Sequence, residues 1–229
     1  MTGFIAGLFD LRVVMVELLG YRLSYLEFLG TATGLACVWL TAREKVWCWP
    51  AGLVNAAFFF AMFFQLRLYS DMLLQVYYLG TSLYGWWRWT HPPTPREANR
   101  KNQLRISVLG GRDRLLLLAA CLASIVAFGA FIGNVHATLP RLFPERAAFP
   151  YADSAVAVLS VFAQFIMARK KLECWLLWIA VDALALVIYF LKGANLLALE
   201  YLVFGGIALY GFLGWRREHQ GYKSTEATA

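Results

Sequence analysis

The sequence predicts an all-α integral membrane protein with seven transmembrane helices. The 229-residue chain is 60% hydrophobic and only 15% charged, whereas a soluble domain is about half apolar and a quarter charged. A spanning helix needs about 20 apolar residues, so seven of them use roughly 140 residues. The remainder is too short for a soluble catalytic domain, which excludes a membrane-anchored enzyme with a water-soluble body. The third observation is an internal repeat, described below.

The N-terminal segment, residues 1–22, is apolar but carries Asp10, Arg12 and Glu17. A signal peptide would have a basic start followed by an uncharged apolar stretch, and this segment has neither. Three charges also argue against a membrane span. We therefore expect an amphipathic helix that lies at the membrane surface.

Seven apolar runs follow, each long enough to cross the bilayer and most of them separated by short polar turns. They cover residues 24–42, 46–64, 69–89, 115–135, 150–168, 172–191 and 195–215. A single long polar stretch, the basic loop 90–114, lies between the third and fourth runs and opens with the helix-stopping sequence His91-Pro92-Pro93. The chain ends in a polar tail, residues 216–229.

Basic residues predict the orientation, because cytoplasmic loops of membrane proteins are enriched in Lys and Arg. The turns after the first and fifth runs, the loop 90–114 and the tail share one side and carry most of them. The N-terminus is then outside and the C-terminus cytoplasmic. This bias explains the net charge of +7. Nucleic acid is not expected as a partner, because no basic stretch carries interleaved stacking aromatics.

Two parts of the chain are similar in sequence. Residues 42–89 align with 168–215 without a gap at an offset of 126, with thirteen identities that include the helix-ending pattern Leu-Tyr-Gly-x3-Trp. Duplication explains this match. It predicts two three-helix repeats, 23–89 and 150–215, joined by a linker helix, 115–135. One linker helix restores the direction of the chain, so the repeats are expected to be parallel, in a 3+1+3 arrangement.

Polar side chains inside the spans predict the binding site, since burying them in hydrocarbon costs a few kcal/mol. The third run places Asp71, Gln75, Tyr78 and Ser82 on one helical face, and the sixth surrounds a central carboxylate with aromatic rings. Such a stripe suits a flat ring with polar edges, and the carboxylate favours a positively charged one. The candidate substrate-binding residues are Asn55, Gln75, Tyr78, Gln164, Trp175, Trp178, Asp182 and Tyr189.

Structural alternatives apply to several of these residues. A lone Asn or Gln in a span is equally often a hydrogen-bonding link between helices. Tryptophans near span ends are usually interfacial belt residues, which we expect of Trp47, Trp86, Trp87, Trp89 and Trp215 and is an alternative for Trp175. No CxxC pair occurs, the four cysteines are taken as small buried hydrophobes, and neither a metal nor a cofactor is expected.

Three motifs resemble the PnuC family of nicotinamide riboside transporters. They are Trp49-Pro50-x-Gly52-Leu53, the run from Leu68-Tyr69-Ser70-Asp71 through Gln75 and Tyr78 to Trp89, and Trp175-x2-Trp178-x3-Asp182. The resemblance covers about residues 24–217, and Ser70 stands where Ala is more usual. It implies 3+1+3 packing, a homotrimer in the bacterial inner membrane, and facilitated diffusion of nicotinamide riboside. It further implies metabolic trapping by a cytoplasmic riboside kinase.

Other functions remain open at this point. Members of the same family carry thiamine or riboflavin. A SWEET-like sugar transporter would share the parallel repeats, and a polytopic membrane enzyme would need converging acid, base or metal-ligand residues, for which the sequence has no motif. No GxxxxGK[ST] loop is present and all three histidines lie outside the runs, so we expect uniport rather than ATP- or proton-driven transport.

Overall fold

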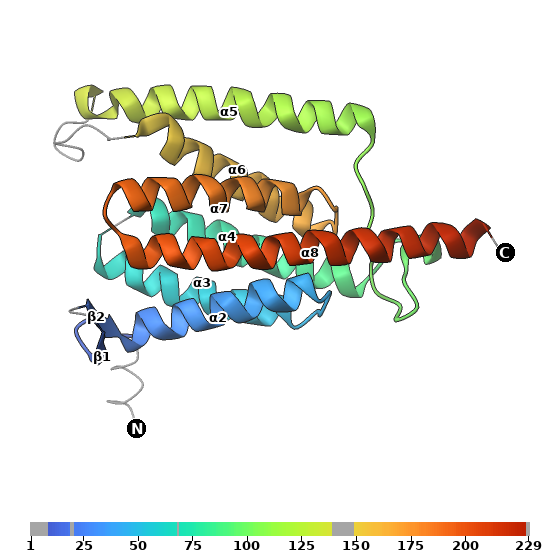
Figure 1. Ribbon diagram of the computed structural model, residues 1–229, viewed down its shortest axis with the longest axis horizontal. Coiled ribbons are helices and arrows are strands. Elements are labelled where there is room, and N and C mark those ends of the chain that lie inside the picture. Colours follow the sequence, from blue (N-terminus) through green and yellow to red (C-terminus); the bar gives the residue numbers. More distant parts are fainter. Residues whose placement is uncertain (1–8, 19–20, 68, 139–148, 228–229) are drawn as a thin grey trace. The chain divides into compact units, whose positions relative to one another are not determined.

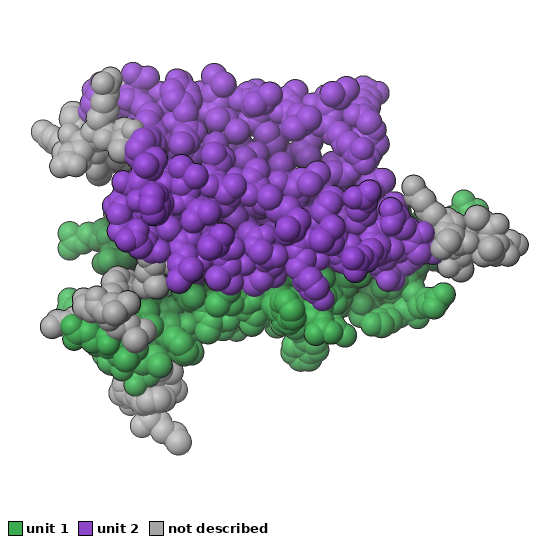
Figure 2. Space-filling model, viewed as in Figure 1, with its two compact units in different colours: residues 1–104 green, residues 105–229 purple. Residues whose placement is uncertain are grey.

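The computed structural model describes residues 9–18, 21–67, 69–138 and 149–227. The chain divides into two compact units, residues 1–104 and residues 105–229, which Figure 2 colours green and purple. Within the described residues there are seven α-helices, one short 3₁₀-helix and one two-stranded sheet (Figure 1). Each unit is described by itself, with the element labels of Figure 1.

The first unit contains the hairpin, three long helices and the 3₁₀-helix. Its elements are β1 (Val14–Leu18), β2 (Tyr21–Ser24), α2 (Tyr25–Ala42), α3 (Cys48–Gln65), α4 (Tyr69–Thr90) and η1 (Pro95–Glu97). Helix α2 begins with a capping box, in which the Ser24 side chain accepts from the Glu27 amide and the Glu27 carboxylate accepts from the Ser24 amide. Such a box satisfies two amides that the first helical turn leaves without partners. α3 packs against both α2 and α4.

The prediction of an N-terminal amphipathic helix over residues 1–22 is wrong where the structure describes this segment. Residues 14–18 and 21–24 form an antiparallel hairpin, with Glu17 opposite Arg22 and Val16 opposite Leu23. β-branched valines at positions 13, 14 and 16 favour extended backbone over helix. The first eight residues lie outside the described ranges.

The second unit contains four helices. They are α5 (Gly111–Thr138), α6 (Pro150–Ala168), α7 (Cys174–Leu191) and α8 (Asn195–Ala227). α6 starts with Pro150 in its first turn, where the missing amide hydrogen is tolerated. Consecutive helices pack in pairs, α5 with α6, α6 with α7, and α7 with α8.

The helices agree with the predicted runs to within a few residues, with two exceptions. α5 begins four residues earlier and ends three later than the run 115–135, so the loop after α4 is shorter than predicted. α8 continues to Ala227, so the predicted polar tail is helical as far as the structure describes it (Figure 1). Contacts of this extension with residues 105 and 106, given below, explain why the helix continues beyond the apolar run.

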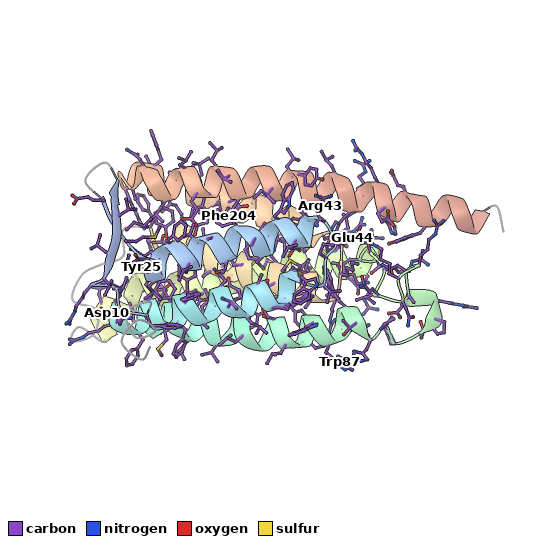
Figure 3. All side chains as sticks on the ribbon, turned by 90° about the horizontal axis from the view of Figure 1, so that it is seen from below. Asp10, Tyr25, Arg43, Glu44, Trp87 and Phe204 are labelled. Carbon is purple, nitrogen blue, oxygen red and sulfur yellow. The ribbon has the colours of Figure 1, made fainter. Side chains whose placement is uncertain are left out.

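The repeated sequence produces repeated local geometry. The turns after α2 and α6 each contain a residue with positive φ, Glu44 at 56° and Lys170 at 54°, at matching positions. The turns after α3 and α7 also contain a residue with positive φ at matching positions. These residues are Arg67, with φ of 58°, and Gly193, with φ of 74°. Figure 3 shows Arg43 and Glu44 at the opposite end of α2 from Tyr25. Both copies of the duplicated sequence therefore fold their turns in the same way.

Each repeat contains a pair of packed tryptophan rings at corresponding positions. The Trp49 and Trp89 rings meet edge to face at 5.2 Å and 88°, and the Trp175 and Trp215 rings at 5.5 Å and 90°. All four rings are buried. The expected belt role of Trp89 and Trp215 is therefore wrong, because each packs inside its own unit, whereas Trp47, Trp86 and Trp87 are exposed.

Glycine makes room for these pairs. A methyl group on Gly85 would meet the Trp49 ring, and one on Gly211 would lie 2.6 Å from the Trp175 ring. Such distances are shorter than real Cβ contacts. The repeated Leu-Tyr-Gly-x3-Trp pattern thus supplies one ring of each pair and, through its glycine, the space for the partner ring from the neighbouring helix.

Five helices are long and apolar enough to cross a membrane by length and composition. Among the described residues, these are α3, α5, α6, α7 and α8. α2 and α4 are not among them. α4 carries Asp71, Gln75 and seven Tyr or Trp residues, which lower its hydropathy although its 22 residues suffice in length.

Candidate functional site

The face of α7 that carries the predicted stripe contains Trp178, Asp182 and Tyr189. Steps of four and seven residues place their side chains on one side of a helix with 3.6 residues per turn. Trp178 is half-buried and Asp182 is 6% exposed. The stripe thus combines a large ring, a carboxylate and a phenol along one surface of α7.

α8 approaches α7 closely at Asp182. A Cβ placed on Gly205 would lie 3.5 Å from the Asp182 Cβ, an ordinary van der Waals distance, so Gly205 lies directly beside Asp182. Among the described residues, no donor lies within hydrogen-bond distance of the carboxylate of Asp182. A buried carboxylate without a protein donor can accept hydrogen bonds from a ligand or face its positive charge.

Tyr189 stacks on Tyr201 of α8, with ring centroids 5.4 Å apart and planes inclined by 8°. Tyr201 also meets Phe204 edge to face at 6.4 Å. Lys192 lies 5.9 Å from the Tyr189 ring centroid and pairs with Asp153 at 3.2 Å. The far end of the stripe is therefore an aromatic cluster held between α7 and α8, with a cation at its edge.

Gln164 is a buried residue of α6, the helix packed beside α7. The part of the chain that the structure describes supplies no hydrogen-bond partner for its side-chain amide. An amide has two donors and an accepting oxygen, which suits the polar edge of a nucleoside or vitamin.

Trp175 differs from the other candidates. Its ring is 1% exposed, packs against Trp215 and covers Gly211, as the matching ring of Trp49 does in the first unit. The structure therefore gives it a packing role, and we do not retain it as a ligand contact. Its position just inside the end of the span had left both interpretations open.

Asn55 acts as a link between helices. Its side-chain Nδ2 donates to the Gly30 carbonyl oxygen at 2.7 Å, which joins α3 to α2. Gly34 lies beside the same amide group, and a Cβ there would be 2.9 Å from Nδ2. The structural alternative stated for a lone Asn describes this residue.

Gln75 and Tyr78 lie on α4 in the first unit. Gln75 is buried, and within the described ranges its side-chain amide has no hydrogen-bond partner. The Tyr78 ring lies 5.8 Å from that of Tyr77, at 55°. The candidates are thus divided, with Asn55, Gln75 and Tyr78 in the first unit and the other five in the second.

Two further features bear on the chemistry. No group of three or more His, Cys, Asp or Glu side chains in the described residues could hold a metal ion. The first unit has a hollow of about 240 Å³ lined by Val46, Trp47, Pro50 and Trp86, which includes none of the candidates.

Sequence reasoning missed two residues near the site. Tyr201 lies in the last predicted span and was not among the candidates, because its stacking on Tyr189 of another helix cannot be read from spacing within one helix. Glu173 directly precedes α7 and binds the segment before α5. One signal pointed to it: a charged residue stands where the first repeat has Trp47.

Comparison with known proteins places the chain among transporters. Residues 24–217 match the family model described as nicotinamide mononucleotide transporter. The nicotinamide riboside transporter PnuC of Escherichia coli is 37% identical over 211 residues, which cover 86% of this chain and 87% of the relative. The riboflavin/roseoflavin transporter RibM of Streptomyces davaonensis is 25% identical over 190 residues, 82% of this chain and 83% of the relative.

A solved structure supports the same fold. The crystal structure of the vitamin B3 transporter PnuC superposes with a TM-score of 0.63 at 22% identity, covering 84% of this chain and 81% of that chain. The family match spans nearly all described helices and includes the α4 and α7 motifs. The chain belongs to the nicotinamide mononucleotide transporter family.

Proposed function

We propose that this protein is a membrane transporter, not an enzyme, and that it carries nicotinamide riboside. The observation that carries the proposal is the identity with the Escherichia coli nicotinamide riboside transporter over most of both chains. The site is compatible with this cargo. The pyridinium ring of nicotinamide riboside is flat and positively charged, and the α7 stripe offers a half-buried indole four residues from a buried carboxylate.

Each retained candidate has a proposed role. Trp178 stacks on the ring with cation–π attraction, and Asp182 faces the positive charge or accepts from a hydroxyl. Gln75, Tyr78 and Gln164 hydrogen-bond the carboxamide and ribose, since the two glutamine amides are buried without protein partners in the described ranges. Tyr189 closes the aromatic end of the stripe through its stack on Tyr201.

Transport is proposed to be facilitated diffusion. No nucleotide-binding loop is present in the sequence, which argues against direct coupling to ATP hydrolysis. His136 and His219 lie beyond the predicted apolar runs but inside helices α5 and α8, so the absence of proton coupling is left to the experiment below. Accumulation beyond equilibrium then requires that the arriving riboside be consumed, and phosphorylation by a cytoplasmic riboside kinase would trap it. In proteoliposomes without nucleotide or ion gradient, labelled nicotinamide riboside should equilibrate across the membrane and accumulate no further. Accumulation that depends on a proton gradient would contradict this mechanism.

The proposed arrangement in the membrane follows the family. We place the protein in the bacterial inner membrane as a homotrimer, with the N-terminus outside, the C-terminus cytoplasmic, and two parallel three-helix repeats joined by α5 as the linker. Matching turns and tryptophan pairs in the two units support duplication of the repeat. Cysteines introduced at Arg12 and Arg217 and labelled from either side of the membrane test the orientation. The mass of the protein complex in detergent tests the homotrimer.

Binding of candidate vitamins to purified protein tests the substrate. Nicotinamide riboside should bind more tightly than riboflavin or thiamine, and Trp178→Ala and Gln75→Ala should each weaken it at least about tenfold. Trp87→Ala, at an exposed ring, is the matched control and should bind normally. If riboflavin, which the name of the second relative gives as its cargo, bound more tightly, the proposed substrate would be wrong while the family assignment would stand.

A further inference from the structure

The segment before α5, residues 105–110, runs along the turn between α6 and α7, and we call it the strap. The Ser107 amide donates to the Lys170 carbonyl oxygen at 3.1 Å, and the Leu172 amide donates to the Ser107 carbonyl oxygen at 2.9 Å. These two bonds form a parallel β-bridge between Ser107 and Lys171. The strap therefore pairs with the turn through its backbone.

Glu173 holds the end of the strap. Its two carboxylate oxygens accept from the Leu109 amide at 3.0 and 3.1 Å, and one also accepts from Arg114 Nε at 2.8 Å. The Glu173 side chain is 11% exposed. Charge-assisted bonds to a shielded carboxylate are among the stronger hydrogen bonds in proteins. Glu173 thus ties the residue before α7 to the first turn of α5.

The strap also contacts the extension of α8. Ile106 is completely buried, and its carbonyl oxygen lies 3.2 Å from His219 Nδ1. The Arg105 guanidinium lies 4.6 Å from the Tyr222 ring centroid. The strap consequently joins three elements of the second unit: the start of α5, the α6–α7 turn and the end of α8.

The first unit shows that the turn does not need a strap in order to form. Its matching turn has the same positive φ at Glu44, and the amide of Lys45 donates to Leu40 as that of Lys171 donates to Ile166. The position of Glu173 is taken there by Trp47, which is 74% exposed and lines an open hollow. Because the same turn folds in both copies, the strap contacts serve something other than local folding.

We propose that Glu173, acting with the strap, is a positioning residue for substrate binding by α7. Trp178 follows Glu173 by five residues, about 7.5 Å along the helix axis. A change in the position of the first turn of α7 therefore displaces the ring that faces the substrate, and misplacement of about 1 Å weakens a binding or reacting geometry strongly. This inference rests on the proposed function, which assigns the stripe to substrate binding.

Uptake of nicotinamide riboside into proteoliposomes tests the assignment. In Glu173→Ala the KM should rise about fivefold or more, and in Glu173→Gln less, because the amide keeps one oxygen for the Leu109 amide but loses the charge that faces Arg114. Arg114→Gln should raise the KM by about as much as Glu173→Gln does. Trp47→Ala is the matched control at the same position of the first repeat, and its KM should stay at the wild-type value.

A disulfide separates positioning from general stability. The Cα atoms of residues paired in a β-bridge, here Ser107 and Lys171, lie about 4.8 Å apart, within the range for a disulfide. Cysteines at these two positions can therefore hold the strap on the turn when the Glu173 carboxylate is removed. In the Glu173→Ala background, oxidation of this pair should return the KM to within about twofold of wild type, and reduction should reverse the effect. Single cysteine variants control for the oxidant. An unchanged KM in Glu173→Ala, or oxidation without rescue, would overturn the proposal.

Hydrogen exchange distinguishes this inference from the proposed function. In purified Glu173→Ala, amides in the first turns of α5 and α7 should exchange faster, whereas Trp47→Ala should leave the first turn of α3 unchanged. This readout needs no substrate. If the wild-type protein fails to take up nicotinamide riboside, the proposed function is contradicted. If hydrogen exchange in Glu173→Ala is unchanged, the proposal that Glu173 holds the strap against the first turn of α7 is contradicted.

Discussion

Replacing Gly211 by alanine should destabilise the protein, although alanine is the better helix former. The added methyl group would lie 2.6 Å from two atoms of the Trp175 ring and 2.8 Å from a third. The ring cannot move away easily, because it is buried and also packs edge to face against Trp215 at 5.5 Å. Accommodation therefore requires separation of α7 from α8 or loss of the ring pair.

The expected loss in the free energy of unfolding of Gly211→Ala is the difference between two packing costs and one gain in helix propensity. Overpacking costs typically about 1–3 kcal/mol, and loss of the edge-to-face geometry costs about 0.5–1.5 kcal/mol more. Helix propensity returns about 1 kcal/mol when alanine replaces glycine. The net destabilisation is about 0.5–3.5 kcal/mol. At ~2–4 °C per kcal/mol for a chain of this length, the Tm in detergent should fall by roughly 1–14 °C.

A control variant lies in the same helix. Gly206 has no atom within 4 Å of an added Cβ, so Gly206→Ala should keep or raise the Tm. The first repeat offers the same comparison, with Gly85→Ala destabilising and Gly80→Ala harmless. A Gly211→Ala variant as stable as Gly206→Ala would refute the reasoning that the glycine exists to make room for the ring.

Three further predictions concern the polar residues. Trp178→Phe should retain part of the nicotinamide riboside affinity that Trp178→Ala loses, as measured by calorimetry, because a smaller ring still stacks. Asn55→Ala should lower the Tm by an amount that corresponds to about 0.6–2 kcal/mol, since it removes the bond to the Gly30 carbonyl, while the Kd of the purified protein changes little. Asp153→Asn should change the Tm by less than the equivalent of about 1 kcal/mol, because its ion pair with Lys192 is partly exposed.

The helices were predictable because membrane spans are encoded by local composition. Lys and Arg clusters, prolines and short polar turns set their ends, and these signals need no knowledge of packing. The hairpin at 14–24 was missed because the apolar N-terminal segment was read as amphipathic, while its valines favoured strand. The extension of α8 was missed because His219 and Tyr222 depend on partners near residue 106, more than one hundred positions away.

The candidate site was predictable only in part. Helical spacing placed Trp178, Asp182 and Tyr189 on one face, since that relation is local to α7. Partners on another helix were not predictable in this way. Asn55 bonds to Gly30, Trp175 covers Gly211, and Tyr189 stacks on Tyr201. Each of these assignments depends on which helices pack together, and a hydropathy pattern does not contain that information.

The duplicated sequence offers a criterion that separates packing from function. Positions that stayed identical include Trp49, Gly85 and Trp89 with their counterparts, and the structure uses them in the same way in each unit. Asp182 and Glu173 instead stand where the first repeat has Ala56 and Trp47.

A pair that is needed to close a three-helix unit must be kept in both copies, whereas a group that contacts an asymmetric substrate is needed in one. Trp175 is the single candidate at an identical position, and it is the one that the structure assigns to packing. Asn55 shows the limit of the criterion, because it differs from its counterpart Val181 and still serves as a helix link.

Identity between copies thus argues for a packing role. Divergence becomes evidence for a ligand contact only when the side chain also lacks a protein partner, as for Asp182 within the described residues. Glu173 diverges but bonds to Leu109 and Arg114, which fits a positioning residue and not a ligand contact.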